Sequence, residues 1–426
     1  MEKLCAFLDY AHSTYHAVDF LKKKLISSGY QPLSEGADWE LIPGEKYFVT
    51  RGGSAVMAFR VPKGTPCGFM MAAAHSDRPT FKLKENGELE GKYTRLSVER
   101  YGGMLIAPWL DRTLSLAGRV LVETEKGIEG RLLDIDRDLL LIPNVAIHMN
   151  RAANDGYKWN PAVDVLPLIG GKDAKGKLNT LLEEQAGGKI LGHDLFLYVR
   201  EKAKLWGIDK EYISAQGIDD LACAWACAEG FLRAGESESV PILSVFDSEE
   251  VGSGSVQGAA SDFLEATLQR VCVALGWNLK KMLSQSFMIS ADNGHAIHPN
   301  HPELADPQNA PVIGGGVVLK FNAAQKYTTD GVSGAVVRSV AKKAEVKVQT
   351  YYNRADLPGG STLGYISLSH VSVLSADIGL AQLSMHSCYE TAGVQDAISL
   401  VNLMAAYYGS SLSVPEDGNY QLTMDN

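Results

Sequence analysis

Short, almost wholly apolar runs predict the strands of this chain. They lie at residues 68–74, 241–246, 287–291 and 371–376, each bounded by polar or glycine-rich sequence. Runs of this length with little polar alternation are typical of strands covered on both faces, as in a parallel sheet. Apolar residues at helical spacing predict two helices over residues 4–25, an alanine-rich helix over 221–233 and a C-terminal helix over 392–408. The pattern indicates an α/β fold, with a mixed sheet between two layers of helices.

The pattern changes between about residue 80 and residue 206. Short alternating strands such as residues 119–123 are mixed there with charged turns and with a loop poor in apolar residues at 154–180. We therefore predict a second, mainly β domain inserted into the α/β/α domain. The expected boundaries place residues 1–80 and 207–426 in the α/β/α domain and residues 81–206 in the inserted one.

The composition narrows the functional classes. At 426 residues the chain exceeds the size of one ordinary core, and 46% apolar with 21% charged residues is typical of a globular enzyme. A net charge of −10 argues against nucleic acid as a partner, because phosphate backbones require a basic surface. No apolar run is long enough to span a membrane. The six cysteines are dispersed and the N-terminus lacks the apolar core of a signal peptide, so a reduced, cytoplasmic protein is expected.

Titratable side chains stand just beyond the predicted strands and at the start of one predicted helix: His75, Asp219 or Asp220, Glu249 and Glu250, Asp292, and His386. Ligands of open α/β sheets bind outside the carboxyl ends of the strands, so these residues are expected to meet. Histidines with several carboxylates suit two divalent cations of the zinc type, with one carboxylate bridging. Two such ions about 3.5–4 Å apart hold a hydroxide and polarise a carbonyl, while a glutamate that binds no metal takes the proton. This is the equipment for amide hydrolysis.

Each feature also has a plainer interpretation. An aspartate before a helix is an ordinary N-cap, and Glu249-Glu250 alone would fit a solvated acidic turn. The glycine-rich segments at residues 252–254 and 314–316 would fit a dinucleotide-binding turn, although the two glutamates would repel a pyrophosphate beside the first of them. A non-catalytic scaffold is a further alternative, and the complete ligand set argues against it.

The motifs resemble those of the aspartyl aminopeptidase family of two-zinc exopeptidases. The resemblance rests on residues 73–79 (Ala-Ala-His-Ser-Asp-Arg-Pro), 219–221 (Asp-Asp-Leu), 247–253 (Asp-Ser-Glu-Glu-Val-Gly-Ser), 290–292 (Ser-Ala-Asp) with 295–300, and 385–387 (Met-His-Ser). It extends almost end to end, from Phe7 to the C-terminal helix. The fold it implies is a metallopeptidase catalytic domain with an inserted dimerisation domain.

The resemblance implies a role for each metal ligand. His75 and Asp292 would hold one ion, Glu250 and His386 would hold the other, and Asp219 would bridge the two. The ions implied are two Zn²⁺ per subunit, with Co²⁺ or Mn²⁺ as alternatives.

Four further residues gain a role from the resemblance. Asp77 would support His75 from behind, and Glu249 would be the general base. Lys320 resembles the family lysine that pairs with an acidic substrate side chain, whereas the residue pattern alone favours a surface lysine. His148 resembles the histidine that reaches a neighbouring subunit's active site, whereas its apolar surroundings in the sequence are typical of a core histidine.

The resemblance also implies peptide substrates, removal of an N-terminal Asp or Glu, and a dodecamer built from dimers. Two departures bear on these expectations. Asn144 stands where family members commonly have a histidine, which affects the surroundings of His148. Residues 359–362 and Cys388-Tyr389 differ from the expected forms, so an aminopeptidase of neutral or broad specificity is the alternative.

Overall fold

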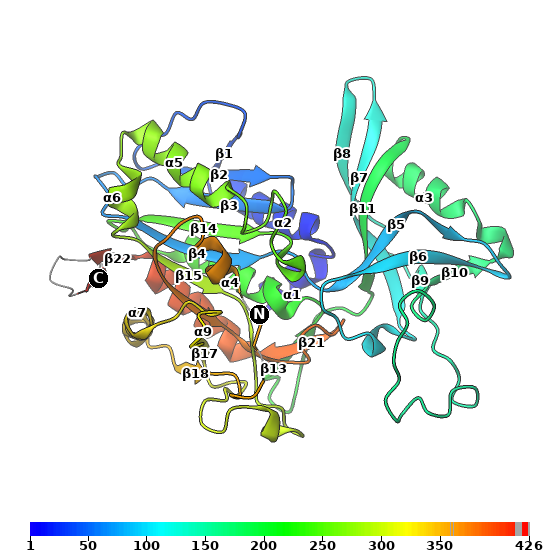
Figure 1. Ribbon diagram of the computed structural model, residues 1–426. Helices are drawn as coiled ribbons and strands as arrows, with labels where there is room; N and C mark the ends of the chain where they lie inside the picture. The colour runs from blue at the N-terminus through cyan, green and yellow to red at the C-terminus, as the bar shows by residue number, and fades with distance from the viewer. Residues whose placement is uncertain (358, 361, 414–419, 425–426) are drawn as a thin grey trace.

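A nine-stranded mixed sheet forms the centre of the larger part of the molecule, in the order β1-β2-β3-β14-β4-β15-β19-β17-β18 (Figure 1). The computed structural model describes residues 1–426 except 358, 361, 414–419 and 425–426. β14, β4, β15 and β19 run parallel, with antiparallel neighbours on either side, which confirms the predicted mixed sheet. The strands are β1 (Gln31–Leu33), β2 (Lys46–Arg51), β3 (Ala55–Arg60), β4 (Phe69–His75), β14 (Val240–Phe246), β15 (Phe287–Ala291), β17 (Val317–Lys320), β18 (Val348–Tyr351) and β19 (Leu374–Gly379).

The last of the predicted apolar strands begins later than its sequence suggests. β19 begins at Leu374 rather than at residue 371. Val371 instead donates its backbone N–H to the carbonyl of Ser367 at 2.9 Å and so continues the turn of the short helix α8 (Leu363–Ser367). A helical turn and a strand compete for the same backbone donors, and apolar composition does not decide between them.

Helices cover both faces of this sheet and enclose two apolar cores. One core takes residues from α1 (Glu2–Tyr10), α2 (Thr14–Ser27), α4 (Ile218–Arg233), α7 (Gly331–Lys343) and α9 (Val394–Tyr408), and the other from α5 (Phe263–Leu275), α6 (Leu279–Leu283) and α8. Successive residues of a strand point to opposite faces, so Met70 of β4 lies in the first core and Met71 in the second. Burial on both faces explains why the predicted strands are almost wholly apolar.

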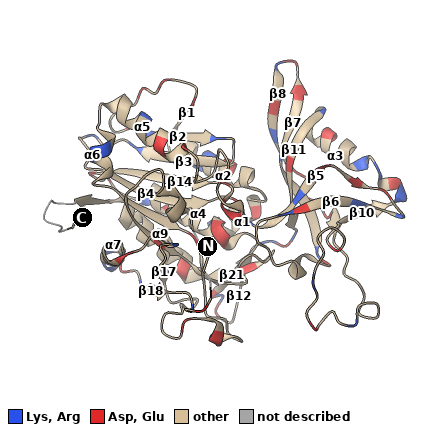
Figure 2. Cartoon of the chain, in the orientation of Figure 1, with Lys and Arg blue, Asp and Glu red and all other residues tan. Residues whose placement is uncertain are grey.

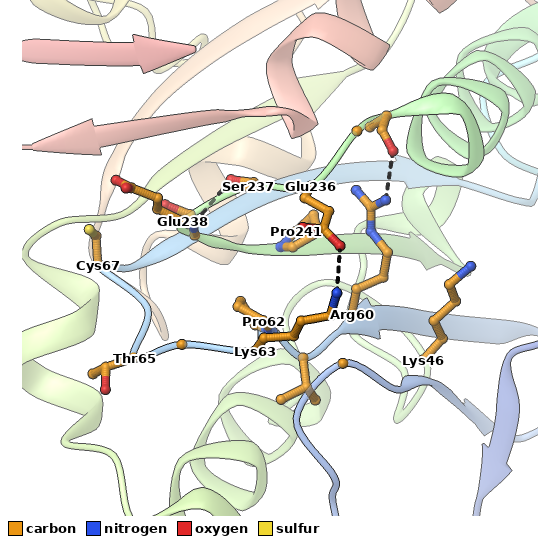
Figure 3. A pocket seen from close by; sticks show the side chains of 16 residues that line it. Lys46, Arg60, Pro62, Lys63, Thr65, Cys67, Glu236, Ser237, Glu238 and Pro241 are labelled. Carbon is orange, nitrogen blue, oxygen red and sulfur yellow. Dashed lines mark hydrogen bonds and ion pairs between the residues drawn. The ribbon is translucent and has the colours of Figure 1, made fainter. Parts of the chain in front are cut away.

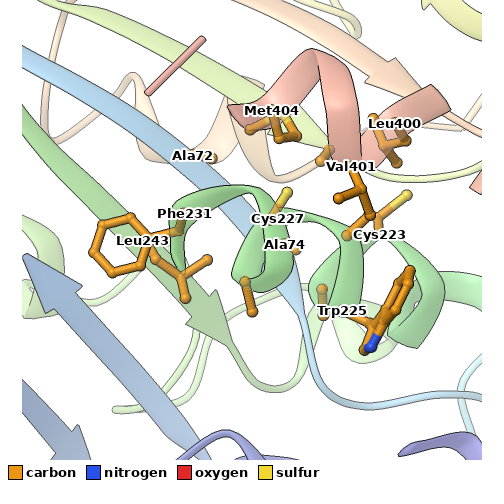
Figure 4. Packing of buried hydrophobic residues seen from close by; sticks show 14 of the residues in the cluster. Ala72, Ala74, Cys223, Trp225, Cys227, Phe231, Leu243, Leu400, Val401 and Met404 are labelled. Carbon is orange, nitrogen blue, oxygen red and sulfur yellow. The ribbon is translucent and has the colours of Figure 1, made fainter. Parts of the chain in front are cut away.

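α4 and α9 pack against each other over the sheet (Figure 4). Cys223 and Cys227 lie on the buried face of α4 near Met404 of α9, and both cysteines are 0% exposed. Gly230 permits this approach, because a Cβ there would lie 2.5 Å from the Cβ of Met404. Burying a side chain such as Met404 contributes about 1.5–3 kcal/mol. The four-residue spacing of the two cysteines thus reflects a core face of the helix.

A second sheet of seven strands lies to one side of the first, in the order β11-β5-β6-β10-β9-β7-β8 (Figure 1). β7 also pairs with β11, so the ladder closes on itself. The prediction of a loop over residues 154–180 is wrong for its last part. β10 and the start of α3 lie there, and Leu178 of α3 is buried. The elements are β5 (Thr80–Leu89), β6 (Tyr93–Tyr101), β7 (Thr113–Thr124), β8 (Gly127–Asp134), β9 (Leu140–Leu141), β10 (Leu168–Gly171), α3 (Lys177–Ala186) and β11 (Ile190–Val199).

A third, smaller sheet brings distant loops together beside α4. Its order is β12-β13-β21-β20-β16, with β12 (Lys204–Trp206), β13 (Tyr212–Ala215), β16 (Gly294–His295), β20 (Ala381–Leu383) and β21 (Glu390–Gly393). The C-terminal strands β22 (Ser410–Ser413) and β23 (Gln421–Met424) pair antiparallel in a separate two-stranded sheet. Charges of both signs are distributed over both parts of the molecule (Figure 2). Among the described residues, the helices are all too short or too polar to cross a membrane.

Candidate metal centre

Three neighbouring strands of the central sheet deliver side chains to one edge. β14, β4 and β15 are adjacent and parallel, so their carboxyl ends coincide. β4 ends at His75, and Asp292 directly follows β15. Glu249 and Glu250 begin the 3-10 turn η3 (Glu249–Val251) that follows β14. Each apolar run stops where the chain leaves the core, so the polar residues that follow the three strands lie at one edge of the sheet.

Two further candidate ligands arrive from outside the sheet. Asp219 lies at the N-terminal end of α4, and His386 lies in the loop between β20 and β21. Pairing of β13, which precedes α4, with β21 holds these two segments together. Atoms of the predicted ligands lie within 4.8 Å of one another in three groups: His75, Asp219, Asp220 and Asp292; His75, Glu249 and Glu250; and Asp219, Glu250 and His386.

Asp219 joins the group of His75 and Asp292 to the group of Glu250 and His386. Its Oδ1 lies 3.8 Å from Nε2 of His75, and its Oδ2 lies 3.6 Å from Nε2 of His386. Nε2 of His386 also lies 3.4 Å from Oε2 of Glu250. The two oxygens of one carboxylate thus face two different histidines, which is the arrangement of a bridging ligand.

Several buried oxygens of these carboxylates lack the partners that buried oxygens require. Within the described part of the chain, Oδ1 of Asp219, Oδ1 of Asp220 and Oε1 of Glu250 are buried and accept no hydrogen bond. An unsatisfied buried polar atom costs about 1–3 kcal/mol, and more when it is charged. Divalent cations among these oxygens would satisfy them, and nitrogen and oxygen donors suit zinc. The residues therefore fit the metal ions that their pattern implies.

Burial controls the protonation of the cluster. Desolvation raises the pKa of Glu249 to about 7 and that of Asp292 to about 6. Desolvation and the charge of Asp219 raise the pKa of Glu250 as well. Burial also opposes the charge of Asp219, but the neighbouring His386 and the charge of His75 lower its pKa overall. Because protons and cations compete for these oxygens, metal binding releases protons.

Asp77 stands behind His75 and both glutamates. Nδ1 of His75 lies 3.3 Å from Oδ1 of Asp77 and 3.1 Å from the Asp77 carbonyl oxygen. The two carboxylate oxygens of Asp77 accept the backbone N–H groups of Glu249 and Glu250, each at 3.1 Å. Asp220, which the residue pattern left open as an alternative to Asp219, accepts the backbone N–H of His75 at 3.2 Å.

Glu390 was missed by the sequence reasoning. It is buried in β21, where Oε2 accepts the backbone N–H of Asp219 at 2.9 Å and Oε1 accepts that of His386 at 2.7 Å. Burial and the charge of Asp219 raise its pKa to about 8. No local pattern marks Glu390, because only the pairing of β13 with β21 brings it to these two candidate ligands.

Lys320 is buried, so its interpretation as a surface lysine is wrong. It ends β17, and its ammonium donates to the backbone carbonyls of Asp292 at 2.7 Å and Asn293 at 3.1 Å. Its Nζ lies 3.9 Å from Oδ1 of Asp292 and 5.0 Å from the ring centre of Tyr327. A positive charge therefore lies directly beside the metal-binding edge.

His148 is exposed in the loop that follows β9, so its interpretation as a core histidine is wrong. It belongs to none of the three ligand groups of its own chain. Asn144, which stands where family members commonly have a histidine, lies in the same loop. Its backbone N–H donates to Oδ1 of Asp111 at 2.9 Å. Of the departures at residues 359–362, Ser361 lies outside the described residues.

A pocket lies at the other end of the sheet, away from the candidate metal ligands (Figure 3). It has a volume of about 710 Å³ and is lined by the end of β3 and the start of β14. Arg60 donates there to the carbonyl of Ala234 at 2.7 Å, and Lys63 pairs with Glu236 at 3.2 Å. Its lining includes none of the candidate metal ligands, so this pocket is separate from the candidate metal centre.

Comparison with known proteins agrees with this geometry. The family described as Aminopeptidase I zinc metalloprotease (M18) matches residues 7–408. A probable M18 family aminopeptidase 2 of Clostridium acetobutylicum is 41% identical over 423 residues, covering 96% of this chain and 98% of that protein. A chain in the cryo-EM structure of the Ape4 and Nbr1 complex superposes with a TM-score of 0.92 at 35% identity, covering 95% of this chain and 84% of that one. The S. cerevisiae mApe1 dodecamer structure gives a TM-score of 0.84 at 26% identity, covering 96% and 95%.

These matches confirm the family inferred from the sequence motifs, and they exclude the dinucleotide-binding alternative. They span nearly the whole chain, including every segment that carries a candidate ligand. A donor set suited to zinc lies at the carboxyl edge of the sheet. The chain therefore belongs to the M18 family of zinc metallo-aminopeptidases, hydrolases that act on peptides.

Proposed function

We propose that this chain is a dinuclear zinc aminopeptidase that removes the N-terminal residue of peptides. His75 and Asp292 would hold one ion, Glu250 and His386 would hold the other, and Asp219 would contribute to both. The strongest support is the position of Asp219, whose two oxygens lie 3.8 Å and 3.6 Å from Nε2 of two different histidines. Two bound zinc ions would supply a Lewis acid for the scissile carbonyl and a water of lowered pKa.

Glu249 serves as the general base in this proposal. Its carboxylate belongs to the ligand groups, and its pKa of about 7, raised by desolvation, suits proton transfer near neutral pH. The backbone N–H of Glu249 is fixed by Asp77, which also stands behind His75. Asp77 thus orients the base and one ligand with the same carboxylate.

Lys320 gives the site a preference for N-terminal Asp or Glu in this proposal. Its buried ammonium lies within 3.9 Å of a carboxylate oxygen of Asp292, so it is a short-range positive charge at the metal edge. A second candidate function is an aminopeptidase of neutral or broad specificity. The observation that favours it is that Lys320 already donates to the carbonyls of Asp292 and Asn293, which leaves fewer N–H groups for a substrate.

Residues 81–206 act as a dimerisation domain between the two catalytic parts, residues 1–80 and 207–426, in this proposal. Apolar side chains flank His148 on an exposed loop: Val145 is 47%, Ile147 47% and Met149 83% exposed. If a second copy of the chain covered this loop, His148 of the first copy would reach the active site of the second. The S. cerevisiae mApe1 structure is that of a dodecamer, and we propose the same assembly here.

Metal analysis combined with hydrolysis of aminoacyl-anilides tests the enzyme proposal. The purified chain should contain two zinc ions, and chelation should abolish hydrolysis until zinc is returned. Glu249→Gln should keep both ions and lose a factor of about 10²–10⁴ in rate, because it removes only the base. Glu250→Gln should lose zinc, because it replaces a ligand. Full activity after complete metal removal would contradict the proposal.

A further inference from the structure

Residues 101–105 of the inserted segment lie directly against the candidate metal ligands, and we call them the strap. The strap begins at the last residue of β6, Tyr101, which pairs with Thr80 at the start of β5. Tyr101 is part of the seven-stranded sheet, and residues 102–105 follow it within the inserted segment. The ligands that the strap contacts belong to the nine-stranded sheet and the small sheet beside it.

The strap holds His386 from two directions. The carbonyl of Gly103 lies 2.5 Å from Nδ1 of His386, and Leu105 donates its backbone N–H to the carbonyl of His386 at 3.0 Å. A carbonyl only accepts, so Nδ1 carries the proton and Nε2 keeps its lone pair toward Asp219. His386 has a φ of 65°, a conformation that costs a non-glycine residue about 1–3 kcal/mol unless its surroundings hold it.

The strap also fixes the residue behind the other histidine. The hydroxyl of Tyr101 donates to Oδ2 of Asp77 at 2.8 Å. Oδ1 of the same carboxylate lies 3.3 Å from Nδ1 of His75. A metal-bound histidine needs such a partner to set its tautomer and ring orientation. Tyr101 therefore acts on His75 through Asp77.

Gly102 allows the strap to lie this close. Its φ is +79°, and a Cβ there would lie 3.1 Å from the Cβ of Glu250 and 3.4 Å from the Glu250 carbonyl oxygen. Any side chain at this position would press on a metal ligand. The strap thus packs on Glu250 at the same time as it orients His386 and, through Asp77, His75.

We propose that the strap is a positioning element of the metal centre, so that the inserted segment completes the zinc site in addition to any role in dimerisation. The proposal rests on the proposed zinc function. Three of the five proposed ligands, His75, Glu250 and His386, depend on it, and none of its residues binds metal itself. Its removal should weaken zinc binding without unfolding the protein.

Zinc affinity of the full-length protein, measured by competition with a chromophoric chelator, tests the role of Tyr101. Tyr101→Phe keeps the ring against Phe196, which lies 5.5 Å away between centres, and removes only the hydroxyl. Loss of such an outer partner weakens metal binding about 10–100-fold. The matched control is Tyr93→Phe on the same strand, since Tyr93 is 62% exposed and away from the site. Tyr101→Phe should lower the melting temperature of the metal-free protein only by the cost of the lost hydrogen bond and should lose zinc affinity in addition, whereas Tyr93→Phe should change neither.

Gly102→Ala tests the packing against Glu250, with Gly176→Ala as the control. Gly176 has the same φ of +79° in the same part of the chain, but a Cβ there would meet nothing within 4 Å. Both variants place an alanine at the same positive φ, but only Gly102→Ala brings a Cβ against Glu250 and should lower zinc affinity, by at least about 10-fold.

The outcomes separate the strap from the proposed function. Zinc affinities of Tyr101→Phe and Gly102→Ala within twofold of the parent would overturn the strap and leave the zinc enzyme intact. A parent chain that binds no zinc would overturn the proposed function and the strap with it. If Gly102→Ala and Gly176→Ala lost zinc affinity equally and Tyr101→Phe lost none, backbone strain alone would explain the result. That outcome would also overturn the proposed role of the strap.

Discussion

Replacing Glu390 by glutamine should weaken zinc binding although Glu390 is not a ligand. The carboxylate accepts the backbone N–H of Asp219 at 2.9 Å with one oxygen and that of His386 at 2.7 Å with the other. Glutamine has the same shape but only one acceptor oxygen, so its amide nitrogen must face one of these N–H groups. One hydrogen bond is lost and a buried donor is left without a partner.

The magnitude follows from the backbone N–H group that is left without an acceptor. A buried donor without a partner costs about 1–3 kcal/mol. At about 1.4 kcal/mol per factor of ten, the zinc affinity should fall about 5–150-fold if this cost falls on the zinc-bound state. The loss should reach both proposed metal positions, because Asp219 belongs to the candidate ligand groups of both.

Chelator competition and metal analysis after dialysis measure this loss, and kcat/KM should fall in parallel at limiting zinc. Glu229→Gln is the matched control, because Glu229 is also buried but pairs with Lys24 of α2 and with Arg233 of its own helix, α4. That control should lower the melting temperature and leave zinc affinity unchanged. Zinc affinity of Glu390→Gln within twofold of the parent would refute the argument that Glu390 positions the ligands.

Three further predictions concern the substrate, the partner subunit and pH. Lys320→Ala should lower kcat/KM for aspartyl and glutamyl anilides about 10–150-fold, from a pairing energy of about 1.5–3 kcal/mol, and change leucyl anilides little. An equal loss for both classes would instead assign Lys320 to holding the carbonyl of Asp292. Mixing inactive Glu249→Gln and inactive His148→Ala subunits under exchange should restore some activity if His148 acts in the partner's site, and no recovery after verified exchange would count against it. Burial raises the folded pKa of Glu249 to about 7 and of Asp292 to about 6, above their ordinary values of 4.5 and 3.8. The folded metal-free protein then binds more protons than the unfolded chain between about pH 4 and 7, so its melting temperature should fall as pH rises through this window. A rise across the same window in chelator-treated protein would contradict the assigned shifts.

The sequence by itself determined the core strands and the residues at their ends. β4, β14 and β15 are buried on both faces, so they appear as apolar runs that need no knowledge of their neighbours. Each run stops where the chain leaves the core, and His75, Glu249 and Asp292 stand at those points. Strands that run parallel share one edge, which is why a local pattern predicted a common site.

Only the tertiary structure decided what surrounds these residues. Glu390 reaches Asp219 through the pairing of β13 with β21, and Tyr101 reaches Asp77 from the second sheet. Neither contact leaves a periodicity or a spacing in the sequence, because it joins elements whose separation along the chain is arbitrary. The same holds for burial of single polar residues: Lys320 is buried and His148 is exposed, the reverse of what their neighbours in the sequence suggest. A side chain's solvent exposure depends on which elements pack over it, and that is fixed by the assembled sheets rather than by local composition.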